Sequence, residues 1–408
     1  MATGASQWIP LISDQWSVTR DPKEKMHVVV NGWFWNQPET GSGQYVRGCI
    51  GALAQLAPDV RFTILVPQDR SGARDPSGLE LPANCDLRPV TCALSNWSKL
   101  RFEQFTFPHL CRELRADVAH VPYWGSPLTP SVPTVVSILD LIPMLLPEYR
   151  GGPLVRAYAG LVKASALNAK LVLTISESSK RDIVKHLHLP ESRVRVTHLA
   201  AGSRYSPRHD PVDEAALRRN HLDLPPAYVL YLGGFDARKN IETLLQVYIW
   251  AQDAIGYDFP LVIAGKLPDA NGPLFRDPRV IAKAIHVEDV VRYIGPVAEE
   301  DKPALYRGAM AFLYPTRYEG FGLPALEALA CGVPVVGSNT SSVPEVVGPA
   351  GMLVDPDDAR LMAGALIAVV TDYELHEKLS VAAVQQAAKF SWEKCARETL
   401  QAYEDTLA

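Results

Sequence analysis

No apolar run in this sequence of 408 residues reaches the length of about 18 residues that a membrane-spanning helix requires. The start of the chain also lacks the basic segment and short apolar core of a secretory signal. These two absences predict a cytoplasmic protein, with at most a peripheral contact at the inner face of a membrane.

The chain has no excess of positive charge and no clustered cysteines. Its 40 Lys and Arg residues are outnumbered by 45 Asp and Glu residues, which gives a formal net charge of −5. This balance excludes the electrostatic footprint of a nucleic-acid-binding protein. The six cysteines, at positions 49, 85, 92, 111, 331 and 395, show no metal-ligand spacing. We therefore expect free thiols and no bound metal.

The sequence does contain a repeated alternation of short apolar strands and helical patterns. An alternation of this kind predicts a parallel sheet that is covered by helices on both of its faces. A segment rich in Gly, Pro and polar residues, 199–213, separates two runs of this alternation and is typical of a linker. The predicted strands lie at 26–30, 62–67, 117–122, 134–140 and 170–176, and then at 227–232, 259–265, 291–295, 311–315 and 333–337.

We therefore predict an α/β protein with two Rossmann-like, doubly wound domains. Residues 1–25 are expected to be an N-terminal extension, 26–205 the first domain and 206–390 the second. Residues 391–408 are expected to form a final amphipathic helix. Open parallel sheets bind ligands outside the carboxyl ends of their strands, so the chemistry is expected in loops that face a cleft between the domains.

The loop after the strand at 311–315 carries two carboxylates around a turn, Glu319 before it and Glu327 after it. Carboxylates accept strong hydrogen bonds from vicinal hydroxyls, and a nucleotide sugar offers such diols on both its hexose and its ribose. The alternative is that acidic residues simply favour the first turn of a helix. That alternative explains Glu327 better than Glu319.

The turn between these glutamates favours close approach to a ligand. Gly320 and Gly322 lack side chains that would block a bound group, and Pro324 suits the first turn of a helix. The amides of Gly322, Leu323 and Ala325 are then expected to be free to bind an anion.

A second loop, 233–240, contains Gly233 and Gly234 and then two adjacent cations, Arg238 and Lys239. Two cations at the start of a helix oppose its dipole unless an anion lies between them. A planar Arg fork together with a Lys point charge suits a diphosphate. The alternative is a solvated basic helix end.

Two further signals are less specific. Lys266 follows the strand at 259–265, and Gly41-Ser42-Gly43 follows the first strand and precedes a helix. The Gly-Ser-Gly run permits close approach to phosphate or sugar, but it lacks the full dinucleotide-binding fingerprint. A plain turn is equally compatible with it.

Taken together, these motifs resemble those of the retaining glycosyltransferases of family 4, which have the GT-B architecture of two Rossmann-like domains facing a central cleft. The resemblance extends from about residue 27 to about residue 404 and includes ISESSKRDIV and PEVVG; its most specific part is the block EGFGLPALE. It implies that Arg238 and Lys239 stabilise the departing diphosphate of a donor. It implies further that Glu319 binds the hexose and Glu327 the ribose, and that the helix at 391–408 crosses back to the first domain. The donor-binding residues it suggests are Gly41, Ser42, Gly43, Gly234, Lys266, Val297, Gly320, Phe321, Gly322, Leu323 and Glu327.

One position departs from the family pattern. The family often has a His-Asp pair after its fourth strand, and here the His position is Leu139 while Asp140 is retained. We therefore expect Asp140 to be catalytic together with Arg238, Lys239 and Glu319. His120, Tyr123 and Trp124 are candidates for the acceptor side of the cleft, although a lone histidine at a strand end is also common as a structural residue.

The resemblance implies a retaining, metal-independent hexosyltransferase with no cofactor beyond its nucleotide-sugar co-substrate. Mannose from GDP-mannose is favoured as the donor, with UDP-hexoses as the alternative, and the acceptor would be a carbohydrate or a lipid-linked sugar of a surface polysaccharide or glycolipid. Two other functions stay open: a catalytically silent nucleotide-sugar-binding partner, and a nucleotide-sugar epimerase. Basic residues at 150, 156, 163 and 170 suggest a contact with anionic lipid, or an ordinary surface helix.

Overall fold

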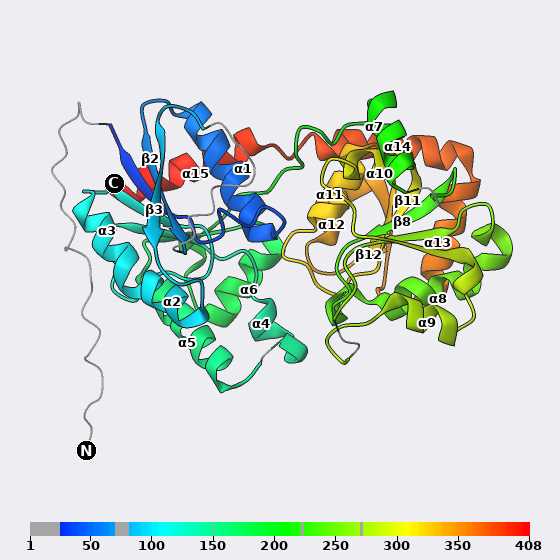
Figure 1. Ribbon diagram of the computed structural model, residues 1–408, viewed down its shortest axis with the longest axis horizontal. Helices are drawn as coiled ribbons and strands as arrows, with labels where there is room; N and C mark the ends of the chain where they lie inside the picture. Colours follow the sequence, from blue (N-terminus) through cyan, green and yellow to red (C-terminus); the bar gives the residue numbers. More distant parts are fainter. Residues whose placement is uncertain (1–24, 70–80, 150, 222–223, 270–271) are drawn as a thin grey trace, which may run out of the picture.

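The computed structural model describes residues 25–69, 81–149, 151–221, 224–269 and 272–408. Two α/β domains lie side by side, each built around one sheet (Figure 1). Of the N-terminal extension predicted for residues 1–25, all but Lys25 lies outside the described residues.

The first domain contains a sheet with the strand order β3-β2-β1-β4-β5-β6-β7, in which all the described neighbours are parallel. The interior strand β1 is buried along its whole length, which explains its run of β-branched residues. The strands are β1 (His27–Asn31), β2 (Arg61–Gln68), β3 (Cys85–Thr91), β4 (Val118–Val121), β5 (Thr134–Ser137), β6 (Leu171–Thr174) and β7 (Val194–Val196). The α-helices are α1 (Gly41–Leu56), α2 (Asn96–Arg101), α3 (Phe107–Glu113), α4 (Ile142–Leu145), α5 (Pro153–Asn168) and α6 (Glu177–Leu187), with a π-helical turn η1 (Phe102–Thr106) between α2 and α3.

The second domain repeats the plan with the order β10-β9-β8-β11-β12-β13, again parallel throughout its described pairs. Its strands are β8 (Tyr228–Leu232), β9 (Leu261–Ala264), β10 (Val291–Gly295), β11 (Ala309–Tyr314), β12 (Val335–Ser338) and β13 (Gly351–Val354). Its helices are α7 (Pro211–Asn220), α8 (Ile241–Ala251), α9 (Pro278–Ala284), α10 (Lys302–Arg307), α11 (Leu323–Ala330), α12 (Val343–Val347), α13 (Ala359–Thr371) and α14 (Tyr373–Ala387).

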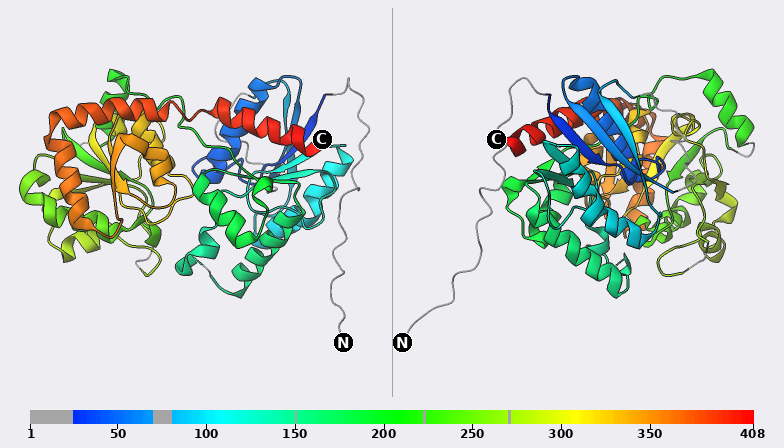
Figure 2. Two further views of the ribbon diagram at one scale, coloured as in Figure 1. Left: turned by 180° about the vertical axis from the view of Figure 1, so that it is seen from behind. Right: turned by 60° about the vertical axis from the view of Figure 1, so that its left-hand side comes forward.

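The last helix, α15 (Trp392–Leu407), leaves the second domain and packs on the first, as Figure 2 shows. The ring of Trp392, the first residue of α15, packs directly on Gly48 of α1. A side-chain carbon added at Gly48 would lie only 2.5 Å from this ring. The hydroxyl of Tyr403 lies 2.7 Å from Nδ1 of His120 on β4. The final helix therefore belongs to the core of the first domain.

Within the described residues, no helix combines the length and the apolar character needed to cross a lipid bilayer. The longest helices, such as α1, α5 and α15, have 16 residues each.

Candidate active site

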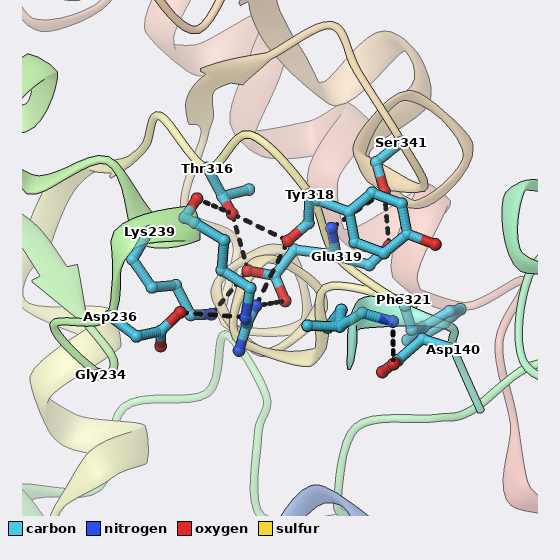
Figure 3. A network of polar contacts seen from close by, with 12 residues as sticks. Asp140, Gly234, Asp236, Lys239, Thr316, Tyr318, Glu319, Phe321 and Ser341 are labelled. Atoms are coloured by element: carbon cyan, nitrogen blue, oxygen red, sulfur yellow. Dashed lines mark hydrogen bonds and ion pairs between the residues drawn. The ribbon is translucent and has the colours of Figure 1, made fainter. Parts of the chain in front are cut away.

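The two loops that the sequence singles out meet in the structure. Nζ of Lys239 lies 2.6 Å from Oε1 of Glu319, and Nη1 of Arg238 lies 2.6 Å from Oε2 of the same carboxylate. The hydroxyl of Thr316 donates a third hydrogen bond to Oε1 at 2.8 Å. Figure 3 shows Lys239 and Thr316 directed at the Glu319 carboxylate. Both cations and both loops therefore share one site at the carboxyl ends of β8 and β11.

The local backbone differs from the sequence prediction in one respect. Arg238 and Lys239 do not begin the long helix: they lie on a 3-10 turn, Ala237–Lys239, and α8 starts only at Ile241, after Asn240 in a left-handed conformation. The anion that offsets the two cations in this structure is the protein's own Glu319, with Asp236 3.1 Å from Nε of Arg238.

Burial and charge act in opposite directions on this cluster. Burial alone would raise the pKa of Glu319, but Arg238 and Lys239 outweigh it and hold that pKa at about 2. Burial lowers the pKa of Lys239, against the opposing pull of Glu319. Burial would lower the pKa of Arg238 as well, yet the carboxylates of Glu319 and Asp236 raise it. Glu319 is therefore held as a carboxylate between two cations.

One guanidinium nitrogen of Arg238 keeps its donor capacity. Nη1 contacts Glu319 and the carbonyl of Tyr318, and Nε contacts Asp236. Within the described part of the chain, Nη2 has no hydrogen-bond partner. A bound anion would find an N–H donor there without breaking the ion pair to Glu319.

Asp140 of the first domain lies across from this cluster. A side-chain carbon at Gly320 would be 3.0 Å from Cβ of Asp140 and 3.2 Å from the carbonyl of Leu139, so glycine lets the two domains touch here. Burial raises the pKa of Asp140, while the amide of Ile142 and the charge of Arg238 lower it. The side chain of Leu139, at the usual His position, is half-buried and packs on the hydrophobic core.

Glu327 lies on the buried face of α11, apart from the Glu319 ion pairs. The hydroxyl of Tyr306 donates to its Oε2 at 3.0 Å. Burial raises the pKa of Glu327 to about 7, with smaller lowering effects from the charge of Lys302 and the hydroxyls of Tyr306 and Tyr205. The two glutamates therefore have opposite electrostatic environments.

The N-terminus of α11 also departs from expectation in one detail. Gly322 caps this helix with a φ of 101°, a conformation that favours glycine. The amide of Ala325 donates to the carbonyl of Gly322 at 3.0 Å. Ala325 was predicted to offer a free amide, and that prediction is wrong because the first turn is tightly wound. The amides of Gly322 and Leu323 stay predicted anion donors.

Other predicted donor residues lie beyond the carboxyl ends of strands in both sheets. Gly234 and Lys266 are exposed after β8 and β9, Val297 is half-buried after β10, and Ser42 is half-buried near the start of α1. At Gly41 an added side-chain carbon would meet nothing, so its backbone is open to a ligand. Their contacts with a donor stay predictions.

Two predicted donor residues are occupied by the protein itself. At Gly43 an added side-chain carbon would lie 1.9 Å from the carbonyl of Gln37, so this glycine permits close packing of its own loop. The buried ring of Phe321 packs against Phe390 at 5.6 Å and His198 at 6.1 Å between ring centroids. The ring of Phe321 therefore packs at the connection between the domains, and a contact of its backbone with a donor stays a prediction.

Two of the three acceptor-side candidates, His120 and Tyr123, are buried and require a correction, while Trp124 stays a prediction. His120 is fully buried, with Nε2 2.9 Å from Oγ of Ser137, and burial lowers its pKa to about 3. Its side chain packs under α15 and does not line the cleft. Tyr123 is also buried, with the ammonium of Lys99 4.9 Å from its ring centroid. Trp124 is half-buried against the core of the first domain.

Sequence reasoning missed the residues that link the site to the first domain. The hydroxyl of Tyr149 donates to Oδ1 of Asp236 and accepts from the amide of Arg238 at 3.4 Å. Thr316 also went unnoticed. Isolated Tyr and Thr residues in loops carry no pattern, so no signal in the sequence would have identified them.

Within the described residues, no group of three or more His, Cys, Asp or Glu side chains is arranged to hold a metal ion. The Asp355-Pro356-Asp357 run has a spacing that often marks metal ligands, but Oδ1 of Asp357 lies 2.7 Å from Nη2 of Arg317.

Both halves of the chain match known families. Residues 40–200 match the glycosyl transferase 4-like domain, and residues 213–386 match glycosyl transferases group 1. O-antigen chain mannosyltransferase B of Escherichia coli is 36% identical over 269 residues, which cover 66% of this chain and 69% of the relative. Serotype-specific mannosyltransferase WbdA of Escherichia coli is 29% identical over 66% of this chain, but the match spans only 33% of WbdA.

Solved structures agree with this assignment at the level of fold. HepE from Anabaena, determined with UDP and glucose, superposes with a TM-score of 0.69 at 16% identity, covering 93% of this chain and 99% of HepE. The two parallel-sheet domains, the sequence matches and this structural likeness lead to one conclusion: the chain belongs to the glycosyl transferases group 1 family, has the GT-B fold and is a hexosyltransferase.

Proposed function

We propose that this enzyme transfers mannose from GDP-mannose, with retention of configuration, to a hydroxyl of a carbohydrate or lipid-linked acceptor in the synthesis of a surface polysaccharide or glycolipid. The observation that carries this proposal is the meeting of Arg238, Lys239 and Glu319 between the two domains. Two cations at the carboxyl ends of parallel strands suit a diphosphate, and a carboxylate beside them suits the hydroxyls of the sugar.

The charge of the departing diphosphate defines what the protein must supply. Arg238, through its remaining N–H, and Lys239 would stabilise the developing negative charge, together with the amides of Gly322 and Leu323. The leaving diphosphate would itself accept the proton of the attacking hydroxyl, on the same face of the sugar that it leaves. No side-chain base and no metal ion is part of this proposal.

Three carboxyl groups would hold the remainder of the donor. Glu319 would accept hydrogen bonds from the hexose hydroxyls, and Asp140 would approach the sugar from the first domain. Glu327 would bind the ribose diol, in place of its present contact with Tyr306. This arrangement lets the second domain hold the nucleotide while both domains contact the sugar.

The identity of the donor rests on the relatives. Both of the sequence relatives described above are named as mannosyltransferases, which favours mannose. HepE was determined with UDP and glucose, so a UDP-hexose is the second candidate.

Calorimetric titration of the full chain with GDP-mannose, UDP-glucose and ADP-glucose tests the proposal. We expect GDP-mannose to bind at least tenfold more tightly than the other two, and mass spectrometry to detect its consumption when acceptor sugars are added. Tight binding with no consumption across a broad acceptor set would favour the silent-partner alternative. Change of the sugar on the nucleotide without transfer would indicate an epimerase.

We also propose a peripheral membrane contact through the first domain. Trp97 and Phe105 on α2 and η1 are 72% and 71% exposed, and exposed Arg101 lies between them in sequence. Helix α5 packs beside this segment through a hydrogen bond from Tyr158 to Glu103 and adds exposed Arg156. Exposed aromatic rings beside basic side chains suit the interface of an anionic bilayer. Of the basic residues noted in the sequence, Arg150 lies outside the described residues.

Vesicle flotation checks this contact. Wild-type protein should float with vesicles containing phosphatidylglycerol and not with pure phosphatidylcholine. Replacing Trp97 and Phe105 together with alanine should lower the partition coefficient onto these vesicles by about two to three orders of magnitude, because each buried aromatic contributes about 2 kcal/mol. Trp250→Ala, an exposed tryptophan on the second domain, is the matched control. Equal losses in both variants, or self-association of the wild type in place of vesicle binding, would contradict the proposal.

A further inference from the structure

The first domain holds the backbone of the loop that carries Glu319. Oγ of Ser176 donates to the carbonyl of Gly320 at 2.7 Å, and Oγ of Ser179 donates to the same carbonyl at 3.1 Å. Both serines are fully buried at the start of α6. Ser176 is in addition the N-cap of α6, accepting from the amide of Ser179 at 3.0 Å. These serines lie in the ISESSKRDIV segment, to which the proposed donor site assigns no role.

Two further contacts flank this pair of hydrogen bonds. The hydroxyl of Tyr318, from the second domain, donates to Oδ2 of Asp182 on α6 at 2.6 Å. The carboxylate of Glu345, on α12, accepts the amide of Glu177 at 3.0 Å through both oxygens. A carboxylate at the first turn of a helix is stabilised by the helix dipole. The first turns of α6 therefore contact the second domain at three points.

The second domain holds the neighbouring peptide of the same loop. The amide of Glu319 donates to Oγ of Ser341 at 2.9 Å, and its carbonyl accepts from Ser342 at 3.0 Å. The carbonyl of Gly320 is the next acceptor along the chain, and it is held by the first domain. The path of the loop from Glu319 to Gly322 is thus set by both domains at once.

The connection between the domains also touches this loop. His198, which follows β7, lies with Nε2 2.6 Å from Oε1 of Glu345. Its ring packs against Phe390, which precedes α15, at 5.5 Å between centroids, and Phe390 in turn packs against Phe321. The chain passes between the domains twice, after β7 and before α15. Both passages meet at Phe321, which follows Gly320. A relative movement of the domains would displace this loop.

We propose that the start of α6 is a latch that places the donor loop only when the cleft is closed, with Ser176 and Ser179 as positioning residues for catalysis. This inference rests on the proposed function in one respect, that the loop binds the donor sugar. The nucleotide would bind to the second domain whether the latch is engaged or not. Sugar transfer would require the latch, because only then does the carboxylate of Glu319 take its catalytic position beside the hexose.

Kinetics of serine variants in the full chain test the latch. Ser179→Ala removes the hydrogen bond to Gly320 without removing the helix cap, and it should lower kcat three- to tenfold. The double variant with Ser176→Ala should lower kcat at least thirtyfold, while the dissociation constant of the free nucleoside diphosphate changes less than twofold. The matched control is Ser95→Ala, which removes the N-cap of α2 in the same domain without touching the second domain; its kcat should stay at the wild-type value.

Hydrogen–deuterium exchange supplies a readout that does not depend on turnover. Amides of residues 318–322 should exchange at least tenfold faster in the double serine variant than in the wild type, and the Ser95→Ala control should match the wild type. Unchanged exchange in the double variant, or a parallel loss of nucleotide binding and kcat, would overturn the latch. A wild-type chain without transferase activity would instead overturn the proposed function, and the exchange comparison would still decide whether the latch exists.

Discussion

Replacing Lys239 with alanine is expected to lower kcat for sugar transfer by about two to three orders of magnitude. The ammonium of Lys239 is buried between Glu319 and Tyr314, so no solvent cation replaces it when a diphosphate develops charge. The measurement is the initial rate of nucleotide release at saturating donor. Lys283→Ala, on the exposed side of α9, is the charge-matched control and should keep full activity.

The same variant should also lose stability, which the sequence did not lead us to expect. Breaking a buried ion pair from one side costs about 3 to 5 kcal/mol, because the remaining charge stays buried. Glu319→Gln should show this loss in full in urea unfolding, and Lys239→Met should show a smaller loss because Glu319 keeps its ion pair to Arg238. The double variant should be more stable than Glu319→Gln, because no unpaired ammonium is then left buried and Arg238 keeps its ion pair to Asp236.

Measurements of kcat separate the catalytic role of this ion pair from its role in the stability of the fold. The double variant should regain stability but not kcat, since the cation that faces the diphosphate is still missing. A double variant that regains both would show that Lys239 and Glu319 serve the fold alone, and the proposed site would then be wrong.

Glu319 and Glu327 are expected to change the free energy of unfolding with pH in opposite directions. The pKa of Glu319 falls from 4.5 to about 2 on folding, so the unfolded chain binds the proton first on acidification. The stability that Glu319 contributes is present above pH 4.5 and is lost as the pH falls towards 2. A shift of this size corresponds to about 3 kcal/mol.

The pKa of Glu327 rises from 4.5 to about 7 on folding, so here the folded chain binds the proton first. The stability that protonated Glu327 contributes to the folded chain is present below pH 4.5 and is lost as the pH rises to about 7. Glu327→Gln should therefore gain up to about 3 kcal/mol relative to the wild type between pH 4.5 and pH 8. Glu319→Gln should show a constant penalty above pH 5 that shrinks at pH 3. Urea unfolding midpoints at pH 3, 5 and 8 check both signs, and parallel pH profiles of the two variants would contradict them.

The proposed ribose contact gives Glu327 a second readout. A diol is held best by the ionised carboxylate, so KM for the donor should fall as the pH rises through about 7. In Glu327→Gln this dependence should disappear. A pH-independent KM in the wild type would remove Glu327 from the proposed donor site.

The strands with continuous apolar runs were predictable from sequence because burial on both faces of a parallel sheet selects such residues. Three of the four edge strands, β3, β7 and β13, were not, whereas the fourth, β10, was predicted at its observed residues 291–295. In β3 the exposed and half-buried positions are mixed and Pro89 interrupts the run, β7 has only three residues, and three of the four residues of β13 are half-buried. Short edge strands bury less apolar surface and therefore leave a weaker periodic signal.

The same contrast applies to the site. Arg238, Lys239 and Glu319 are charged residues in loops after strands, so local sequence was enough to single them out as candidates. Asp140 became a candidate only through the resemblance to the family. The prediction that His120 faces the cleft was wrong. A histidine at the end of a strand looks the same in the sequence whether its ring faces a cleft or packs against a helix. That choice depends on α15, whose Tyr403 is 283 residues away along the chain.

The sequence by itself determined the two parallel-sheet domains and the charged residues of the two loops proposed to bind the donor, because periodic burial and turn chemistry act between near neighbours. Only the tertiary structure decided that Glu319 is paired with both cations, that Glu327 is not, and that Ser176 and Ser179 hold Gly320 from the other domain. These contacts join residues 80 to 144 positions apart, and their energies depend on burial and distance, which no local pattern encodes.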